Sequence, residues 1–439
     1  MTAPPKLTML CWNDYLGITR GRGVPTARLD QVRRNGLGWA VAGTALDPFG
    51  GIVDNPWGPM DEVRQVPDFD ARLTLPDETG GSTLDMVLVR SRSREDGSPW
   101  ECCPRHILET ALSALHEETG ARLMVACEHE FTYTHPDIAP GAAFTLDSVR
   151  RYRAFADALV DAADAAGLAF ETVEPEFGLG QVEVCTKPII GLAGVDAVVL
   201  GREAIREVAR RQGGTAHLVP KLSPDAVGNG AHIHFSFLAD DDAPIGFDPD
   251  GSHEMSALTS AFVAGIFEHI PALTALCAPS PVSYLRLGPQ HWSCGFAAFG
   301  VQNRECAVRI CPSPDPDPTA RAKGYNVEYR PIDATCNPHL ALAALVYAGL
   351  DGVRRGLSPP PIVETDPADL DDADRQRLGV VPLPASLPVA LAAFEADTYL
   401  AGCFPERFMT VFSALKRFEI ERAAERDDAA NCRAYADVY

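Results

Sequence analysis

The sequence predicts a protein of mixed α-helices and β-strands, built as one large domain or as two unequal ones. Residues 1–100 carry short strand patterns around a turn-rich stretch, whereas strand and helix patterns alternate through the rest of the 439 residues. In addition, four strand patterns of the second part place polar or charged side chains on one face. Because such side chains are costly to bury without partners, the four strands predict one lined cavity.

The first hundred residues differ from the rest and predict a small domain. The expected elements are strands at 7–16, 19–24 and 86–89, a short helix near 29–34, and turns at 43–59. The polar, turn-forming stretch 91–99 indicates a boundary. We therefore expect domains at 1–100 and 101–439.

The second part begins with a helix whose ends are marked in the sequence. Pro104 suits a first helical turn, and Gly120 follows the last apolar residue at helical spacing. Asn337 and Pro338 mark the start of a buried helix in the same way. The other expected elements are helices at 147–167, 202–211, 257–267 and 338–349, strands at 127–131, 228–237, 304–310 and 327–330, an acidic loop at 364–374, and two closing helices.

Composition excludes several classes of partner. The formal net charge is −22, and nucleic acids and anionic membranes both require concentrated lysine and arginine. The start of the chain lacks the segments of a signal peptide, and the apolar stretches 257–267 and 340–350 are too short to span a bilayer. None of the twelve cysteines forms a C-x-x-C pair, which argues against a zinc site or a disulfide framework. We expect a cytoplasmic protein.

The stretch GNGAHIHFSF, residues 228–237, has the clearest polar face. In an extended chain His232, His234 and Ser236 point to one side, and three apolar side chains point to the other. Three more strand patterns have a polar face, which carries Glu128 and Glu130, Gln181 and Glu183, or Glu328 and Arg330.

Six side chains could bind divalent cations if they converge: Glu128, Glu130, Glu176, Glu183, Glu328 and His232. Five carboxylates in a confined site need counter-cations, and oxygen ligands with one imidazole favour Mg²⁺ or Mn²⁺. Arg304 and Arg309 suit phosphate oxygens. Each motif alone has an ordinary explanation, as a half-exposed strand or a surface ion pair. Together they indicate nucleotide-dependent phosphoryl transfer.

The order of these motifs resembles the glutamine synthetase superfamily along nearly the whole chain. The matching segments are E-x-E at Glu128, E-x6-E at Glu176 ending in GQVE, GNGAHIHFS, the RL pair at Arg286, NRECAVR, and VEYRPIDATCNPHLALAALVYAGLDG. The resemblance implies an α+β fold, with a small N-terminal β-grasp domain and a catalytic domain whose curved antiparallel sheet is flanked by helices. It also implies a homo-oligomer of stacked rings, a dodecamer, with active sites between neighbouring subunits.

The resemblance also implies two or three metal ions in each site. One ion would be held by Glu130, Glu176 and Glu183. The ion that bridges the nucleotide phosphates would be held by Glu128, His232 and Glu328.

Substrate-binding roles are implied in the same way. The nucleotide would contact His234, Ser236 and Arg309. The transferring phosphoryl group would contact Arg304 and Arg309, and the carboxylates of glutamate would contact Arg286 and Arg330, beside Gly228. ATP would phosphorylate the γ-carboxylate, and an amine would then displace phosphate to leave an amide.

Two departures from the family pattern concern the acceptor. Ammonia-using members carry a D-G-S-S loop in the small domain, whereas this chain has GTALDPFGG, with Asp47 as the nearest acid. They also carry a glutamate in the flap after the RL pair, where this chain has Trp292. A large aromatic side chain removes a cation site and supplies an apolar wall. The chain therefore resembles most the γ-glutamylpolyamine, γ-glutamylethanolamide and γ-glutamylalkylamide synthetases, and we expect Trp292 to contact an organic amine.

Two further positions differ from the family pattern. Val227 stands where many relatives have an asparagine near the substrate amino group, and Asn326 where an additional nucleotide-binding arginine is common. Three functions stay open: a glutamate–amine ligase, an ammonia-using glutamine synthetase, and a non-catalytic structural relative. The first is favoured, because the metal-ligand types are retained and the ammonium site is not.

Overall fold

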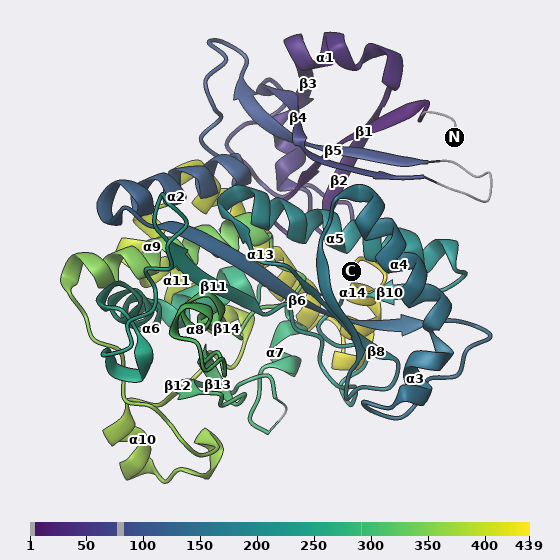
Figure 1. Cartoon of the computed structure of the whole chain (residues 1–439). Coiled ribbons are helices and arrows are strands. Elements are labelled where there is room, and N and C mark those ends of the chain that lie inside the picture. Colours follow the sequence, from purple (N-terminus) through teal and green to yellow (C-terminus); the bar gives the residue numbers. More distant parts are fainter. Residues whose placement is uncertain (1–4, 77–82, 291) are drawn as a thin grey trace.

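Two β-sheets organise the chain, a small one near the N-terminus and a larger one in the rest (Figure 1). The computed structural model describes residues 5–76, 83–290 and 292–439. Within these residues the small sheet has five strands, in the order β2-β1-β5-β4-β3. The larger sheet has ten, eight of them in the order β15-β12-β13-β14-β11-β6-β8-β7, while β9 and β10 both pair with β6.

The small sheet pairs β1 with β5 in parallel and its other neighbours antiparallel. Its elements are β1 (Leu7–Asn13), β2 (Thr19–Pro25), α1 (Leu29–Asn35), β3 (Leu37–Ala40), β4 (Glu62–Leu75) and β5 (Leu84–Ser93). The sequence predicted β1, β2 and α1 but missed β3 and β4. In β4 charged residues separate buried side chains, as Arg72 separates Ala71 from Leu73. The strand predicted at 86–89 is also too short, since β5 continues into the predicted boundary at 91–99.

The larger sheet is built around β6, which pairs with β11 along one part and with β8 along another. All its pairings are antiparallel except that of β12 with β13. Its strands are β6 (Arg122–Thr134), β7 (Phe170–Pro175), β8 (Gln181–Thr186), β9 (Ile189–Ile190), β10 (Thr215–His217), β11 (Ile233–Leu238), β12 (Phe296–Val301), β13 (Cys306–Cys311), β14 (Asn326–Tyr329) and β15 (Val381–Pro382).

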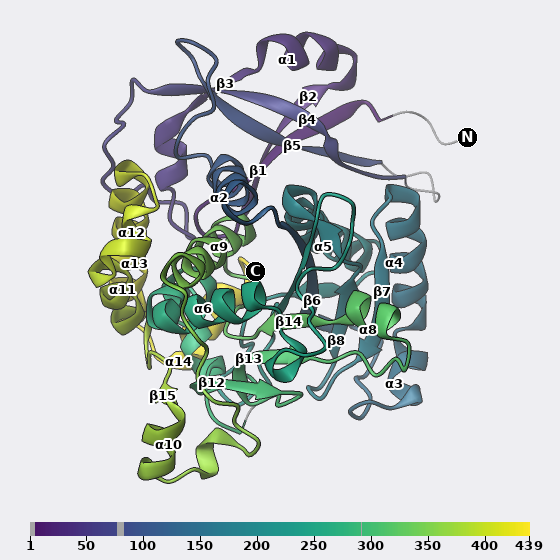
Figure 2. The ribbon, with the colours of Figure 1, turned by 60° about the vertical axis from the view of Figure 1, so that its left-hand side comes forward.

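Helices surround the larger sheet. Figure 2 shows α11, α12 and α13 at one edge of the molecule and α3 and α4 at the opposite edge. The bounds are α2 (Pro104–Thr119), α3 (Leu146–Arg151), α4 (Arg153–Ala166), α5 (Gly191–Arg211), α6 (Ala257–Cys277), α7 (Ser283–Arg286), α8 (Pro318–Gly324), α9 (Pro338–Arg355), α10 (Asp372–Leu378), α11 (Leu387–Ala396), α12 (Thr398–Gly402), α13 (Glu406–Ala424) and α14 (Asp428–Ala436).

The predicted helix starts are confirmed where a cap marks them. Pro104 opens α2, whose C-cap Gly120 has φ 67°, and the Asn337 side chain accepts a hydrogen bond from the Leu340 N–H at the start of α9. Elsewhere the prediction fails. The helix expected at 147–167 is interrupted at Tyr152, α5 begins eleven residues before 202, the acidic loop contains the start of α10, and four helices follow residue 386 instead of two.

The helix α6 extends well beyond the predicted 257–267. It is long and apolar enough to cross a membrane by length and composition alone, but 72% of its apolar window is buried inside the fold. It packs against α9 and α11. The prediction of a core helix is therefore confirmed.

The two faces of β6 separate the core from the site. Val125, Cys127, His129 and Phe131 are buried at alternate positions, and the first and third of these approach glycines of α5. Glu128 lies between them in sequence and points to the opposite face. The period of two therefore turns the carboxylates of β6 away from the helices and toward a cavity.

Candidate active site

Sheet register brings distant carboxylates together. Glu130 on β6 lies opposite Glu183 on β8, and His234 on β11 lies opposite Glu328 on β14. Side chains of directly opposed residues share one face of a sheet and approach within contact distance. Residues far apart in the sequence thus line one surface, as the sequence analysis expected.

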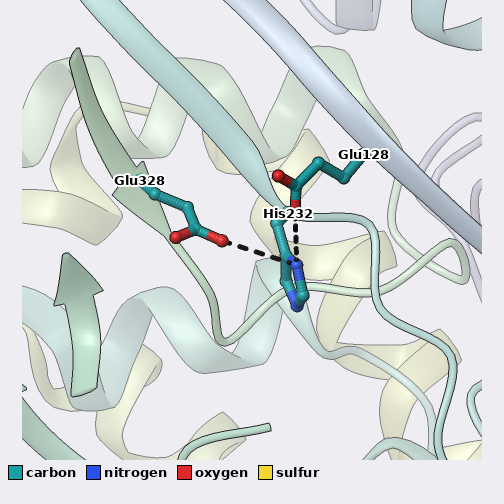
Figure 3. A group of neighbouring side chains, drawn as sticks. All are labelled: Glu128, His232 and Glu328. Atoms are coloured by element: carbon teal, nitrogen blue, oxygen red, sulfur yellow. Dashed lines mark hydrogen bonds and ion pairs between the residues drawn. The ribbon is translucent and has the colours of Figure 1, made fainter. Parts of the chain in front are cut away.

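His232 lies at the centre of this group (Figure 3). Its Nδ1 atom is 2.9 Å from Glu128 Oε2, 3.5 Å from Glu328 Oε1 and 3.6 Å from Glu130 Oε1. One ligand atom from each of Glu128, His232 and Glu328 lies within 4.8 Å of the other two. An imidazole with carboxylate oxygens at this spacing fits the donor set of a divalent cation.

Two acids of the site have raised pKa values, because burial and neighbouring carboxylates disfavour their ionised forms. Burial, followed by the carboxylates of Glu128 and Glu130, raises the pKa of Glu183 to about 9. Burial also raises the pKa of Glu176 to about 7. The protein alone therefore cannot keep all these carboxylates ionised at neutral pH, and divalent cations would supply the missing charge.

Glu128 and Glu328 behave in the opposite way, because cationic or hydrogen-bonding groups surround them. Burial disfavours the charge of Glu128, but hydrogen bonds with His232 and His234 outweigh it and hold the pKa of this carboxyl well below its ordinary value. For Glu328, burial is outweighed by Arg330 and the two histidines, which lower its pKa to about 2. Both carboxylates are thus ionised and ready to bind a metal ion.

The acids open into a cavity of about 690 Å³. The metal-binding wall is the part formed by Glu128, Glu130, Glu183 and His232, with Glu328 behind them. A second cavity of about 420 Å³ is lined by His234, Ser236 and Asn326, and Glu128 lines both cavities. A cation held by Glu128 would therefore lie between two ligand-sized spaces.

Two buried arginines line the same cavity as the metal-binding wall. Arg286 is 1% exposed, and its Nη2 atom lies 3.0 Å from His232 Nε2. Within the described residues its Nη1 atom has no hydrogen-bond partner. Arg330 forms an ion pair with Glu328 and donates a hydrogen bond to the Trp292 carbonyl oxygen at 2.7 Å. The free donor of Arg286 suits a substrate carboxylate.

Two glycines permit this close approach. A Cβ atom at Gly228 would lie 2.6 Å from Arg286 Cγ, and one at Gly230 would lie 2.5 Å from Arg286 Nη2. The resemblance implied a role for Gly228 but not for Gly230, although both lie in the GNGAH motif. The backbone N–H of Gly230 also donates to Glu130 Oε2 at 2.7 Å, which orients a proposed metal ligand.

Several predicted residues occupy positions different from those expected. His232 precedes β11 instead of lying within it, and Arg304 lies in the turn before β13 instead of in a strand. Arg304 is exposed and lines the larger cavity, whereas Arg309 pairs with Glu328. Asp47 is buried and accepts the Phe49 N–H at 2.7 Å, so it turns into its own loop.

Another part of the cavity lining is aromatic. The rings of Phe177 and Trp292 lie 6.0 Å apart between centroids, and both residues line the cavity. We call this pair the acceptor wall. The sequence predicted Trp292 but not Phe177, whose only signal was its place directly after the candidate ligand Glu176.

A sheet-lined cavity with a divalent-cation donor set, buried arginines and an adjoining second cavity defines a metal-dependent enzyme of phosphoryl transfer. Residues 1–100 match the family model described as glutamine synthetase N-terminal domain, and residues 101–435 match the glutamine synthetase catalytic domain. The chain belongs to the glutamine synthetase family and is an ATP-dependent ligase. The expected α+β fold of that family is confirmed.

The similar proteins carry two kinds of name. Gamma-glutamylpolyamine synthetase GlnA3 of Streptomyces coelicolor is 32% identical, over 98% of this chain and 93% of that protein. Glutamine synthetase of Thermococcus kodakarensis is 28% identical, over 90% and 84%. A solved structure described as a novel glutamine synthase homolog has a TM-score of 0.91 and 36% identity, and covers 100% of both chains.

Proposed function

We propose that this chain joins the γ-carboxylate of glutamate to an organic amine, at the expense of ATP and through a γ-glutamyl phosphate intermediate. The observation that carries the proposal is the acceptor wall, where Trp292 occupies the flap position at which ammonia-using relatives have a glutamate. A site that selects ammonium needs anions at close range, whereas an indole offers an apolar surface. The 32% identical γ-glutamylpolyamine synthetase supports the same conclusion.

The metal-binding wall would hold Mg²⁺ or Mn²⁺, two or three ions in each site. Glu130, Glu176 and Glu183 would bind one ion, and Glu128, His232 and Glu328 the ion nearest the nucleotide. Bound divalent cations would neutralise phosphate charge and polarise the phosphoryl group. The donor set fits these hard cations, since it consists of carboxylate oxygens and one imidazole.

The arginines would orient the two substrates. Arg286, with its unpartnered Nη1 atom, and Arg330 would bind the carboxylates of glutamate beside Gly228. Arg304 on the cavity surface would stabilise the transferring phosphoryl group. ATP would occupy the second cavity, where it would contact His234 and Ser236. Arg309 forms an ion pair with Glu328. It would therefore affect the nucleotide by holding the Glu328 carboxylate in place.

The acceptor wall would bind the amine. An alkyl portion that lies on the rings of Phe177 and Trp292 gains about 0.8 kcal/mol for each methylene removed from water. A short organic amine would therefore bind in preference to ammonium. The second candidate is an ammonia-using glutamine synthetase, because many similar proteins, including that of T. kodakarensis, carry that name. A non-catalytic role is disfavoured by the retained cation ligands.

The decisive experiment measures phosphate release from ATP, with glutamate present, across alkylamines, aminoalcohols, diamines and ammonium. We expect at least one organic amine to have a higher kcat/KM than ammonium. Aspartate in place of glutamate serves as the control for the carboxylate donor. If ammonium is the best acceptor across the panel, the chain is a divergent glutamine synthetase.

We also propose the assembly that the family implies. The chain would form a cytoplasmic homo-oligomer of stacked rings, a dodecamer, divided at residue 100 into a β-grasp domain and a catalytic domain. Sedimentation velocity on the 47.2 kDa chain tests the assembly, and a monomer at working concentration would contradict it.

A further inference from the structure

One glutamate ties down the loop that carries Trp292. This loop joins α7 to β12. Glu305 accepts hydrogen bonds from the backbone N–H groups of Gln290, at 3.1 Å, and of Trp292, at 2.9 Å. Because both donors are backbone groups, the carboxylate fixes the path of the chain and not the identity of its side chains.

Three described residues of this loop have backbone conformations that residues other than glycine rarely adopt. Gln290, Trp292 and Cys294 have positive φ angles of 61°, 53° and 60°. Residues in this region persist only where surrounding contacts hold them. Arg330 provides a contact from another side, through its hydrogen bond to the Trp292 carbonyl oxygen. The residue that carries the indole is therefore held through both its N–H and its C=O.

Glu305 is itself anchored. Its backbone N–H donates to Asn303 Oδ1 at 3.1 Å, and the Asn303 amide donates to the carbonyl oxygens of Val363 and Thr365 at 3.0 and 2.9 Å. The turn between β12 and β13 is thus fixed to a third segment of the chain. Two consecutive residues of this turn have different contacts: Arg304 lines the cavity, and Glu305 contacts the loop that carries Trp292.

We propose that Glu305 is a specificity-determining positioning residue, which holds the indole of Trp292 at the acceptor end of the cavity by fixing the loop backbone. The inference rests on the proposed function, in which Trp292 contacts the amine. Without the carboxylate, the positive φ angles would relax and the indole would leave its place beside Phe177. The amine would then bind more weakly, whereas ATP, bound against the strands, would not.

The kinetic test uses Glu305→Ala, Trp292→Ala and the double variant, with n-butylamine and putrescine as acceptor probes. Glu305→Ala should raise the KM for the amine about tenfold, as expected for lost hydrogen bonds to a charged group, and leave the KM for ATP within about twofold. Glu305→Gln keeps one acceptor oxygen, so its KM for the amine should lie between those of the unsubstituted enzyme and Glu305→Ala. The matched control is Glu364→Ala, an exposed glutamate in the segment that anchors Asn303.

In the Trp292→Ala background, Glu305→Ala should not raise the KM for the amine further, because Glu305 acts through the indole. Additive effects in the double variant would overturn the proposal. So would a Glu305→Ala variant that behaves like Glu364→Ala.

A second readout does not depend on the acceptor. Trp292 is the only one of the five tryptophans beyond residue 100, and subtraction of a Trp292→Phe variant isolates its fluorescence anisotropy decay. Glu305→Ala should increase the mobility of this indole at unchanged Tm, and unchanged mobility would refute the positioning role. If ammonium is the best acceptor of the unsubstituted enzyme, the proposed function fails, while the indole mobility still decides whether Glu305 positions Trp292. If Trp292→Ala leaves the preference for amines over ammonium intact, the indole does not select the acceptor and Glu305 is not a specificity-determining residue.

Discussion

The two walls of the cavity are built in different ways. The metal-binding wall lies on or beside paired strands, and its members Glu328 and His232 are 0% and 2% exposed, with several partners each. The acceptor wall lies on loops, where Phe177 and Trp292 are 59% and 54% exposed. Under the proposed function, strand register holds the groups that perform the shared chemistry, and loops carry the side chains that select the acceptor. The comparison therefore locates the proposed acceptor selectivity on the loop-borne wall.

The largest expected effect is on the metal-binding wall. Glu130→Ala should abolish turnover, because it removes a cation ligand, and activity should depend strictly on Mg²⁺ or Mn²⁺. Phosphate release measured against the concentration of each cation checks both points, with the exposed Asp161→Ala as control. Normal turnover in the variant, or full activity in excess chelator, would remove the basis for a metal-binding wall.

Glu328→Ala should lower the free energy of unfolding more than Glu130→Ala does. The Glu328 carboxylate pairs with the buried guanidinium groups of Arg309 and Arg330, so Glu328→Ala leaves both without this partner. Breaking a buried ion pair typically costs about 3–5 kcal/mol. Chemical denaturation should detect this loss in Glu328→Ala and a much smaller one in Glu130→Ala. Equal free energies of unfolding for the two variants would show that the Glu328 ion pairs do not stabilise the fold more than the contacts of Glu130.

Arg304 has one property of each wall. It is exposed like the acceptor wall, and it is proposed to act in the shared chemistry like the metal-binding wall. Arg304→Ala should lower kcat by roughly 10²–10³-fold and raise the KM for ATP much less, since a transition-state contact is lost. Steady-state kinetics with varied ATP separates the two parameters. A change in KM alone would make Arg304 a binding residue for the ground state.

The smallest effects are expected on the acceptor wall, and they concern selectivity. Trp292→Glu restores an anion at the flap position and should narrow the preference for organic amines over ammonium by about tenfold, the equivalent of about 1.4 kcal/mol. Phe177→Ala should weaken amine binding less, because its ring is the more exposed of the two. Ratios of kcat/KM for n-butylamine and ammonium measure both effects. An unchanged ratio in Trp292→Glu would separate the indole from acceptor choice.

Sequence patterns predicted the elements whose local signals agree with their final environment. The alternation around His232 and His234 and the caps of α2 and α9 are such signals. The strand β4 was missed because Asp68, Asp70 and Arg72 obscure its buried positions, and Asp68 pairs with Arg105 from the second part of the chain. The first half of α5 was missed because Gly191, Gly194 and Gly201 lower its helical propensity, although the last two allow close packing on β6.

The sequence by itself determined most of the inventory of the candidate site, since the acids, His232 and the arginines follow one another in a specific order of motifs. A period of two turns Glu128 and Glu130 of β6 to one face. Only the tertiary structure decided that Glu328 neutralises two arginines, that Phe177 stands beside Trp292, and that Glu305 holds the loop backbone. The aromatic pair joins two loops from distant parts of the chain, and the bond from Trp292 to Glu305 joins residues on either side of β12. Local periodicity carries no information about such pairings, because they form only when the sheet and its loops close around one cavity.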